Sequence, residues 1–150
     1  MRKPLATTAA ALSTALLTAG LLAAAPAADA ASTRAASASY PVSSFNVTYG
    51  NTYTKGTITW YNRSIHVAGT QKSVSADSCR GTTAFGVDSK NHDVRRDFSL
   101  YSVCGTSAPF TIDVDFGVPG VSVARICLDN GAKTPPVVYL KCVRYGRPAA

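Results

Sequence analysis

All side-chain carboxylates of this 150-residue chain belong to aspartates, because the sequence contains no glutamate. The only closely spaced pair is Asp113 and Asp115, which an alternating strand would place on one face. Two carboxylates can serve a glycosidase as acid and base, and several oxygens together can bind Ca²⁺ or a sugar. A solvated strand face is the default interpretation of the same two residues. The missing glutamate therefore disfavours hydrolases that depend on paired carboxylates.

The two histidines, His66 and His92, are the only imidazoles available for acid–base chemistry. His66 lies between Ile65 and Val67, so we expect it on the polar face of a strand, and His92 adjoins Asp93 in a polar segment. A Ser-His-Asp triad is a spatial arrangement, and the sequence contains no G-x-S-x-G motif to indicate one. We therefore predict no catalytic residue and a protein that is not an enzyme, with a small hydrolase as the least favoured alternative.

The four cysteines are Cys79, Cys104, Cys127 and Cys142, an even number that favours disulfides in an exported chain. Three connectivities are possible. We prefer Cys79–Cys104 and Cys127–Cys142, because each pair flanks a polar turn region symmetrically and would face across a hairpin. One bridge with two buried thiols is the alternative. No C-x-x-C spacing occurs and both histidines are remote from a cysteine pair, so we predict no metal site and no cofactor.

The first thirty residues have the order of a signal peptide. Arg2 and Lys3 precede an uncharged stretch over residues 4–28, and Ala28-Asp29-Ala30 is a small-x-small cleavage site. A retained membrane anchor is the rival interpretation, but the stretch is rich in Ala, Thr and Ser. We predict a cleaved signal peptide (1–30), a disordered leader (31–39), an extracellular protein and no membrane span after cleavage.

The predicted mature chain is basic. Removing Arg2, Lys3 and Asp29 from the 15 basic and 8 acidic residues leaves 13 and 7, a net charge of +6. Positive charge attracts an extracellular protein to anionic wall polymers. The charges are scattered, as on an ordinary soluble surface, and no motif predicts a specific nucleic-acid partner.

The region from 40 to 147 is predicted to be a single β domain. β-Branched and aromatic residues recur between turn-forming residues, and residues 110–116 alternate apolar and polar positions. Phe98 and Leu100 are expected in a strand that returns toward Cys104. About eight short antiparallel strands with one buried face imply a two-sheet sandwich, immunoglobulin-like or related, with a small closed β-barrel as the alternative.

Two groups of residues are candidates for binding. The polar segment 90–97 is expected to form a hairpin tip whose Arg95 and Arg96 would meet an anionic partner. Tyr53 and Tyr61, with Tyr49, are expected to form an exposed platform on which sugars could stack. A solvated turn and ordinary sheet packing are the alternative interpretations of these two groups.

Parts of the chain resemble a known group of proteins. The segment Gly56-Thr57-Ile58-Thr59-Trp60-Tyr61-Asn62-Arg63-Ser64, the later Val103-Cys104-Gly105 and the alanine-rich leader resemble small secreted actinobacterial β-rich proteins of unassigned function. The resemblance implies export and a β fold, and it implies no catalytic or binding residue.

These observations favour a secreted, non-enzymatic module that binds a cell-wall polymer or glycan. The alternative is an inhibitor or antagonist of another protein, in which a disulfide-braced loop docks onto a target enzyme and loses little entropy on binding.

Overall fold

A computed structural model of the chain describes residues 40–117 and 121–149, which form an all-β structure without a helix. The predicted signal peptide (1–30) and leader (31–39) lie outside the described residues. Within the described part, no helix is long and apolar enough to cross a membrane.

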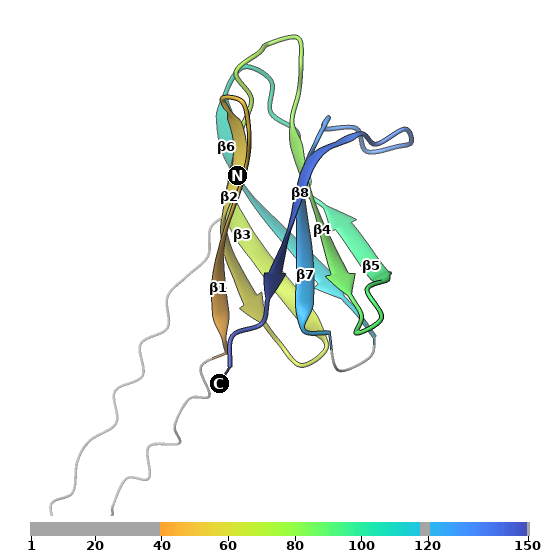
Figure 1. Ribbon diagram of the computed structural model, residues 1–150. Helices are drawn as coiled ribbons and strands as arrows, with labels where there is room; N and C mark the ends of the chain where they lie inside the picture. The colour runs from red at the N-terminus through yellow and green to blue at the C-terminus, as the bar shows by residue number, and fades with distance from the viewer. Residues whose placement is uncertain (1–39, 118–120, 150) are drawn as a thin grey trace, which may run out of the picture. The chain divides into compact units, whose positions relative to one another are not determined.

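The eight strands form two antiparallel sheets that pack face to face (Figure 1). One sheet has the order β1-β2-β3-β6 and the other β5-β4-β7-β8. The sheets are not closed into a barrel, so the predicted sandwich is confirmed and the barrel alternative is wrong. The strands are β1 (Val42–Tyr49), β2 (Thr52–Trp60), β3 (Ser64–Lys72), β4 (Gly81–Val87), β5 (Asp93–Phe98), β6 (Ser107–Asp115), β7 (Val123–Asp129) and β8 (Tyr139–Gly146).

The core follows the period-two pattern of the sequence. In β6, Ile112 and Val114 are buried while Asp113 and Asp115 are exposed, as the alternation predicts. Trp60 at the end of β2 is fully buried, and its Nε1 donates a hydrogen bond to Ser43 Oγ at 2.9 Å, which satisfies the one polar atom of the indole.

Strand β4 departs from the alternating pattern, because all seven of its residues are buried. Ala84 belongs to the core between the sheets, whereas its neighbour Phe85 faces the other way and is only 3% exposed. Two long side chains cover that outer face: the Arg125 guanidinium lies 4.1 Å from the Phe85 ring centroid, and the Tyr139 ring packs edge-on at 5.6 Å. Strand β4 is therefore covered on both sides.

The strand expected through Phe98 and Leu100 ends at Phe98, so the prediction for Leu100 is wrong. The cause is Ser99, whose N–H donates to the Thr82 carbonyl at 2.8 Å while its Oγ accepts the Thr82 N–H at 3.1 Å. The Ser99 side chain thus replaces a backbone acceptor and the chain leaves the sheet. Leu100 is 73% exposed as a result.

Both predicted disulfides are present, Cys79–Cys104 and Cys127–Cys142. Cys127 on β7 and Cys142 on β8 are direct cross-strand partners, as the argument from symmetric spacing requires. Two bridges and no free cysteine in the described part are compatible with an oxidising, extracellular compartment.

Candidate functional site

The segment between β5 and β6, residues 99–106, is called here the 99–106 loop. Its Leu100 and Tyr101 are 73% and 74% exposed, which makes them the two most exposed large apolar side chains of the described residues. Exposed apolar side chains that lie side by side on a small domain indicate an interaction site more often than isolated ones do. The 99–106 loop is therefore the leading candidate for recognition.

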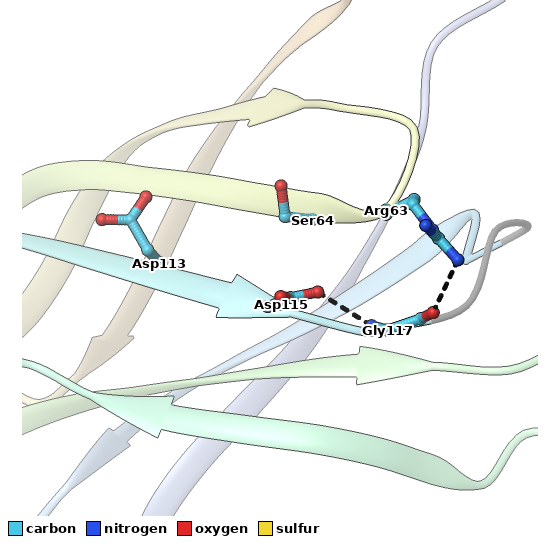
Figure 2. A pocket seen from close by; sticks show the side chains of 5 residues that line it. All are labelled: Arg63, Ser64, Asp113, Asp115 and Gly117. Atoms are coloured by element: carbon cyan, nitrogen blue, oxygen red, sulfur yellow. Dashed lines mark hydrogen bonds between the residues drawn. The ribbon is translucent and has the colours of Figure 1, made fainter.

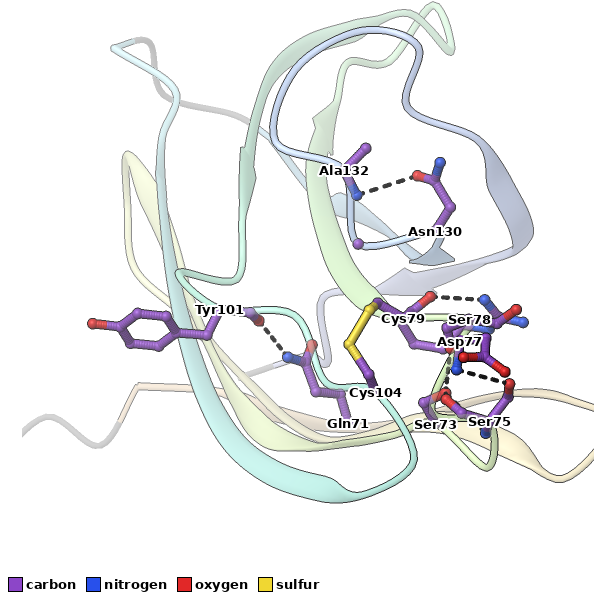
Figure 3. The surroundings of a disulfide bond; sticks show 12 residues. Gln71, Ser73, Ser75, Asp77, Ser78, Cys79, Tyr101, Cys104, Asn130 and Ala132 are labelled. Carbon is purple, nitrogen blue, oxygen red and sulfur yellow. Dashed lines mark hydrogen bonds between the residues drawn. A yellow bond between two sulfur atoms is a disulfide. The ribbon is translucent and has the colours of Figure 1, made fainter.

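The loop is tied to the sandwich at its centre (Figure 3). Gln71 of β3 is 1% exposed, and its Nε2 donates to the Tyr101 carbonyl at 2.6 Å. The Oε1 of the same amide accepts a hydrogen bond from Thr82 Oγ1 at 3.0 Å, and that hydroxyl also lies 2.8 Å from Thr54 Oγ1. A buried polar network with satisfied groups rigidifies what it holds, so the position of Tyr101 is fixed from inside the protein.

The C-terminal end of the loop is fixed by backbone pairing and by the first disulfide. Arg80 and Val103 exchange two backbone hydrogen bonds of 2.8 and 2.9 Å, beside the Cys79–Cys104 bridge. Ser73 N–H donates to the Thr106 carbonyl at 2.9 Å. The loop therefore cannot move away from the segment 73–80 without breaking a covalent bond.

The N-terminal end of the loop is held by Lys133, whose Nζ donates a hydrogen bond to the Ser99 carbonyl. Burial lowers the pKa of this ammonium group, while the carboxylates of Asp129 and Asp97 act in the opposite direction. Between the fixed residues Ser99 and Tyr101, the N–H and C=O of Leu100 make no hydrogen bond within the described residues. Leu100 therefore presents an exposed side chain together with an N–H and a C=O that are open to a partner.

A cavity of about 180 Å³ lies beside the exposed pair. Leu100 and Tyr101 form one side, and β6 contributes Pro109, Phe110 and Thr111. A partner that covers Leu100 would find room there for an apolar group of its own.

The predicted tyrosine platform is not assembled. Tyr53 lies at the start of β2, with Lys55 Nζ 4.7 Å and Lys72 Nζ 6.0 Å from its ring centroid. Tyr61 follows the other end of that strand and packs edge-on against Tyr40, with centroids 4.5 Å apart. Eight residues of extended chain separate the two rings by about 26 Å, too far for one sugar ring to contact both.

Arg95 and Arg96 lie inside strand β5, because the hairpin turn is shorter than expected and the strand begins at Asp93. Arg95 is paired with Gly86 and Arg96 with Phe85, so the two side chains leave opposite sides of the strand. The Nη1 of Arg96 donates to Tyr139 Oη at 2.9 Å. The two arginines therefore do not form a joint clamp on a hairpin tip.

The aspartate pair borders an open cavity of about 380 Å³ (Figure 2). Asp115 Oδ1 accepts the Gly117 N–H at 2.8 Å, and Asp113 Oδ1 lies 2.7 Å from His66 Nδ1. Ser64 neighbours His66 on the same strand face, but no hydrogen bond joins them among the described residues. In the same part of the chain, no group of three His, Cys, Asp or Glu side chains could hold a metal ion. A His-Asp pair is thus present without an oriented nucleophile.

His92 belongs to the β4–β5 turn, where it has a structural role. Asp88 Oδ1 accepts the backbone N–H groups of Lys90 at 2.9 Å and His92 at 2.8 Å. The hydrogen bond from His92 N–H is the main cause that lowers the pKa of the exposed Asp88 carboxyl.

No protein-family model, curated protein or solved structure matches the chain.

Leu100 was not predicted to be a functional residue, because the alternation Phe98-Ser99-Leu100 is typical of a strand. The available signal was the position of this segment just before Cys104. A disulfide-braced loop was expected for an inhibitor, but its location was not predicted.

Proposed function

We propose that this protein is a secreted, non-enzymatic inhibitor or antagonist that docks its 99–106 loop into an apolar cleft of a target enzyme. One observation carries the proposal: Leu100 is 73% exposed on a loop whose neighbouring residues are fixed by a disulfide and by buried hydrogen bonds.

The energetic reason is preorganisation. Burying a leucine side chain stabilises a complex by about 1.5–3 kcal/mol. Ordering a mobile loop at an interface costs about 0.5–1.5 kcal/mol for each side chain that is immobilised. Because the loop is already ordered at Ser99 and Tyr101, most of the gain from Leu100 remains available for binding.

The geometry suits an endopeptidase with an apolar specificity pocket. Such enzymes select one side chain of a chain segment that enters the cleft, and they bind the backbone groups around it. Leu100 offers an apolar side chain together with an N–H and a C=O that are not bonded to the rest of the described protein. The Cys79–Cys104 bridge would keep the ends of the loop in place after binding.

The proposal that the protein is not itself an enzyme is supported by the histidines. His66 is paired with Asp113 without a serine bonded to it in the described part, and His92 lies in a turn built around Asp88. General acid–base catalysis requires a group within hydrogen-bond reach of a reacting atom in a defined pose.

The test uses the purified chain against three serine proteases. We expect inhibition of chymotrypsin and subtilisin, which accept large apolar side chains, and not of trypsin. Leu100→Asp should weaken inhibition about 30-fold, because about 2 kcal/mol of apolar burial is lost. Leu100→Lys should move inhibition to trypsin, since its specificity pocket carries an aspartate.

The matched control is Val138→Asp, which introduces the same charge at another half-exposed apolar residue, outside the loop. This variant should inhibit like the parent protein. The proposal fails if none of the three proteases is inhibited by either the parent or the lysine variant, or if Val138→Asp weakens inhibition as much as Leu100→Asp.

A further inference from the structure

The outer face of the β5-β4-β7-β8 sheet carries a row of residues that crosses all four strands. Arg96 pairs with Phe85, Phe85 with Arg125, and Arg125 with Arg144. Partners in a ladder point to the same side of a sheet. The neighbouring residues Ala84, Ala124, Ile126 and Val143 pack in the core, so the row faces away from the other sheet.

The row is held in place by aromatic contacts. Arg125 lies over the Phe85 ring, with the guanidinium carbon 4.1 Å from the centroid. Tyr139 packs against the same ring and accepts a hydrogen bond from Arg96 at 2.9 Å. Two of the three guanidinium groups are therefore oriented before any ligand arrives, which reduces the entropy lost on binding.

The charge of the row is only partly compensated. Asp93 binds Nη2 of Arg125 and is the only carboxylate paired with an arginine of the row in the described residues. Arg96 and Arg144 are exposed, and neither forms a salt bridge in that part of the chain. Arg95 leaves the opposite side of β5 and is not part of the row, whereas Arg96 borders a cavity of about 310 Å³ beside Phe85 and Asp93.

We propose that this row, defined by Arg96, Arg125 and Arg144, binds a linear phosphodiester polymer of the polyol-phosphate kind. Neighbouring strands are about 4.8 Å apart, so the three residues extend over about 14 Å across the sheet. Guanidinium groups bind phosphate oxygens bidentately, and several in a row bind successive phosphates of one chain. The positive charge of the protein supports the approach of such a polymer.

The aromatic residues of the face disfavour a single-stranded nucleic acid as the ligand. Proteins that bind single strands offer exposed aromatic rings on which bases stack. Here Phe85 is 3% exposed beneath Arg125, and Tyr139 is half-buried with its hydroxyl bonded to Arg96. The row recognises charge and spacing without a surface for bases.

The test compares three polyanions by fluorescence titration: poly(glycerol phosphate), polygalacturonate and single-stranded DNA. We expect the full chain to bind poly(glycerol phosphate) more tightly than the other two. Arg96→Gln/Arg144→Gln should weaken that binding at least about tenfold, as expected for the loss of two charge-assisted contacts. Leu100→Asp should not change it, because the 99–106 loop is a separate surface.

The matched control is Lys55→Gln/Lys72→Gln, which removes the same charge from the other sheet, beside Tyr53. It should retain binding to within about twofold, since both lysines belong to β2 and β3 of the other sheet and are not part of the row. Equal losses in the two double variants would overturn the proposal in favour of net charge alone. Tighter binding of DNA or polygalacturonate would also overturn it. Arg144→Gln alone, which removes no hydrogen bond within the described protein, should weaken binding without a change in thermal stability.

Discussion

At the scale of single residues, the last residue of β7 has an unusual buried carboxyl. Asp129 is 2% exposed, and its two oxygens accept hydrogen bonds from Thr83 Oγ1 at 2.6 Å and from the Gly131 N–H at 2.7 Å. Burial raises the pKa of this carboxyl above its ordinary value of 3.8, against the smaller opposing effects of the hydrogen bonds and of Lys133. The folded protein therefore holds a proton here more tightly than the unfolded chain does.

This difference predicts a pH dependence of stability. With a raised folded pKa, the stabilising contribution of the protonated form is complete below pH 3.8 and is lost as the pH rises through the folded pKa. Asp129→Asn has no proton to lose, so its free energy of unfolding should lack that decline. Urea denaturation at a series of pH values from about 3 to 7 measures the difference. Asp77→Asn, at an exposed aspartate, should keep the parent profile, and an Asp129→Asn profile identical to the parent would contradict the prediction.

At the scale of elements, two glycines determine how the first sheet packs. Phe45, Gly56, Gly69 and Phe110 are successive partners across β1, β2, β3 and β6. The two phenylalanine rings lean over the central strands, and their centroids are 6.4 Å apart. Glycines beneath aromatic rings are a known device for pinning the register of a sheet.

Gly69→Ala tests this arrangement. A Cβ atom at residue 69 would lie 2.2 Å from the Lys55 carbonyl oxygen and 3.1 Å from the Gly56 Cα. Because both neighbours belong to the backbone of β2, the strands must separate, at a cost of about 1–3 kcal/mol in the free energy of unfolding. Gly146→Ala in β8 is the control, since no atom lies within 4 Å of its Cβ position. Denaturant midpoints for the two variants should differ, and equal midpoints would show that the first sheet accommodates the methyl group.

The sequence predicts those features of the architecture that depend on residues close together in the chain, and it does not predict those that depend on residues far apart. The alternation in residues 110–116 and the symmetric spacing of the cysteines are local, and both predictions are confirmed. Leu100 was misplaced because a single side-chain hydrogen bond of Ser99 ends the strand. The arginine row depends on the register of four strands between residues 85 and 144, which no local pattern encodes.

At the scale of the whole molecule, the two disulfides have different roles. Cys127–Cys142 joins neighbouring strands of one sheet, whereas Cys79–Cys104 joins the 99–106 loop to the segment before β4. The bridges close loops with sequence separations of 25 and 15 residues, and the loop-entropy relation assigns each about 3 kcal/mol. By stability alone, the two bridges should therefore be nearly equivalent.

The two disulfides should differ in their effect on protease inhibition. Cys79→Ala/Cys104→Ala and Cys127→Ala/Cys142→Ala should each lower the free energy of unfolding by about 3 kcal/mol in urea titrations. At a temperature where both variants are folded, only the first should lose protease inhibition, because its loop regains the freedom that the bridge removes. The second variant should inhibit like the parent, since the Cys79–Cys104 bridge still holds the loop. Equal inhibition by the two folded variants would mean that the hydrogen bonds alone preorganise Leu100, and that the first disulfide only stabilises the fold.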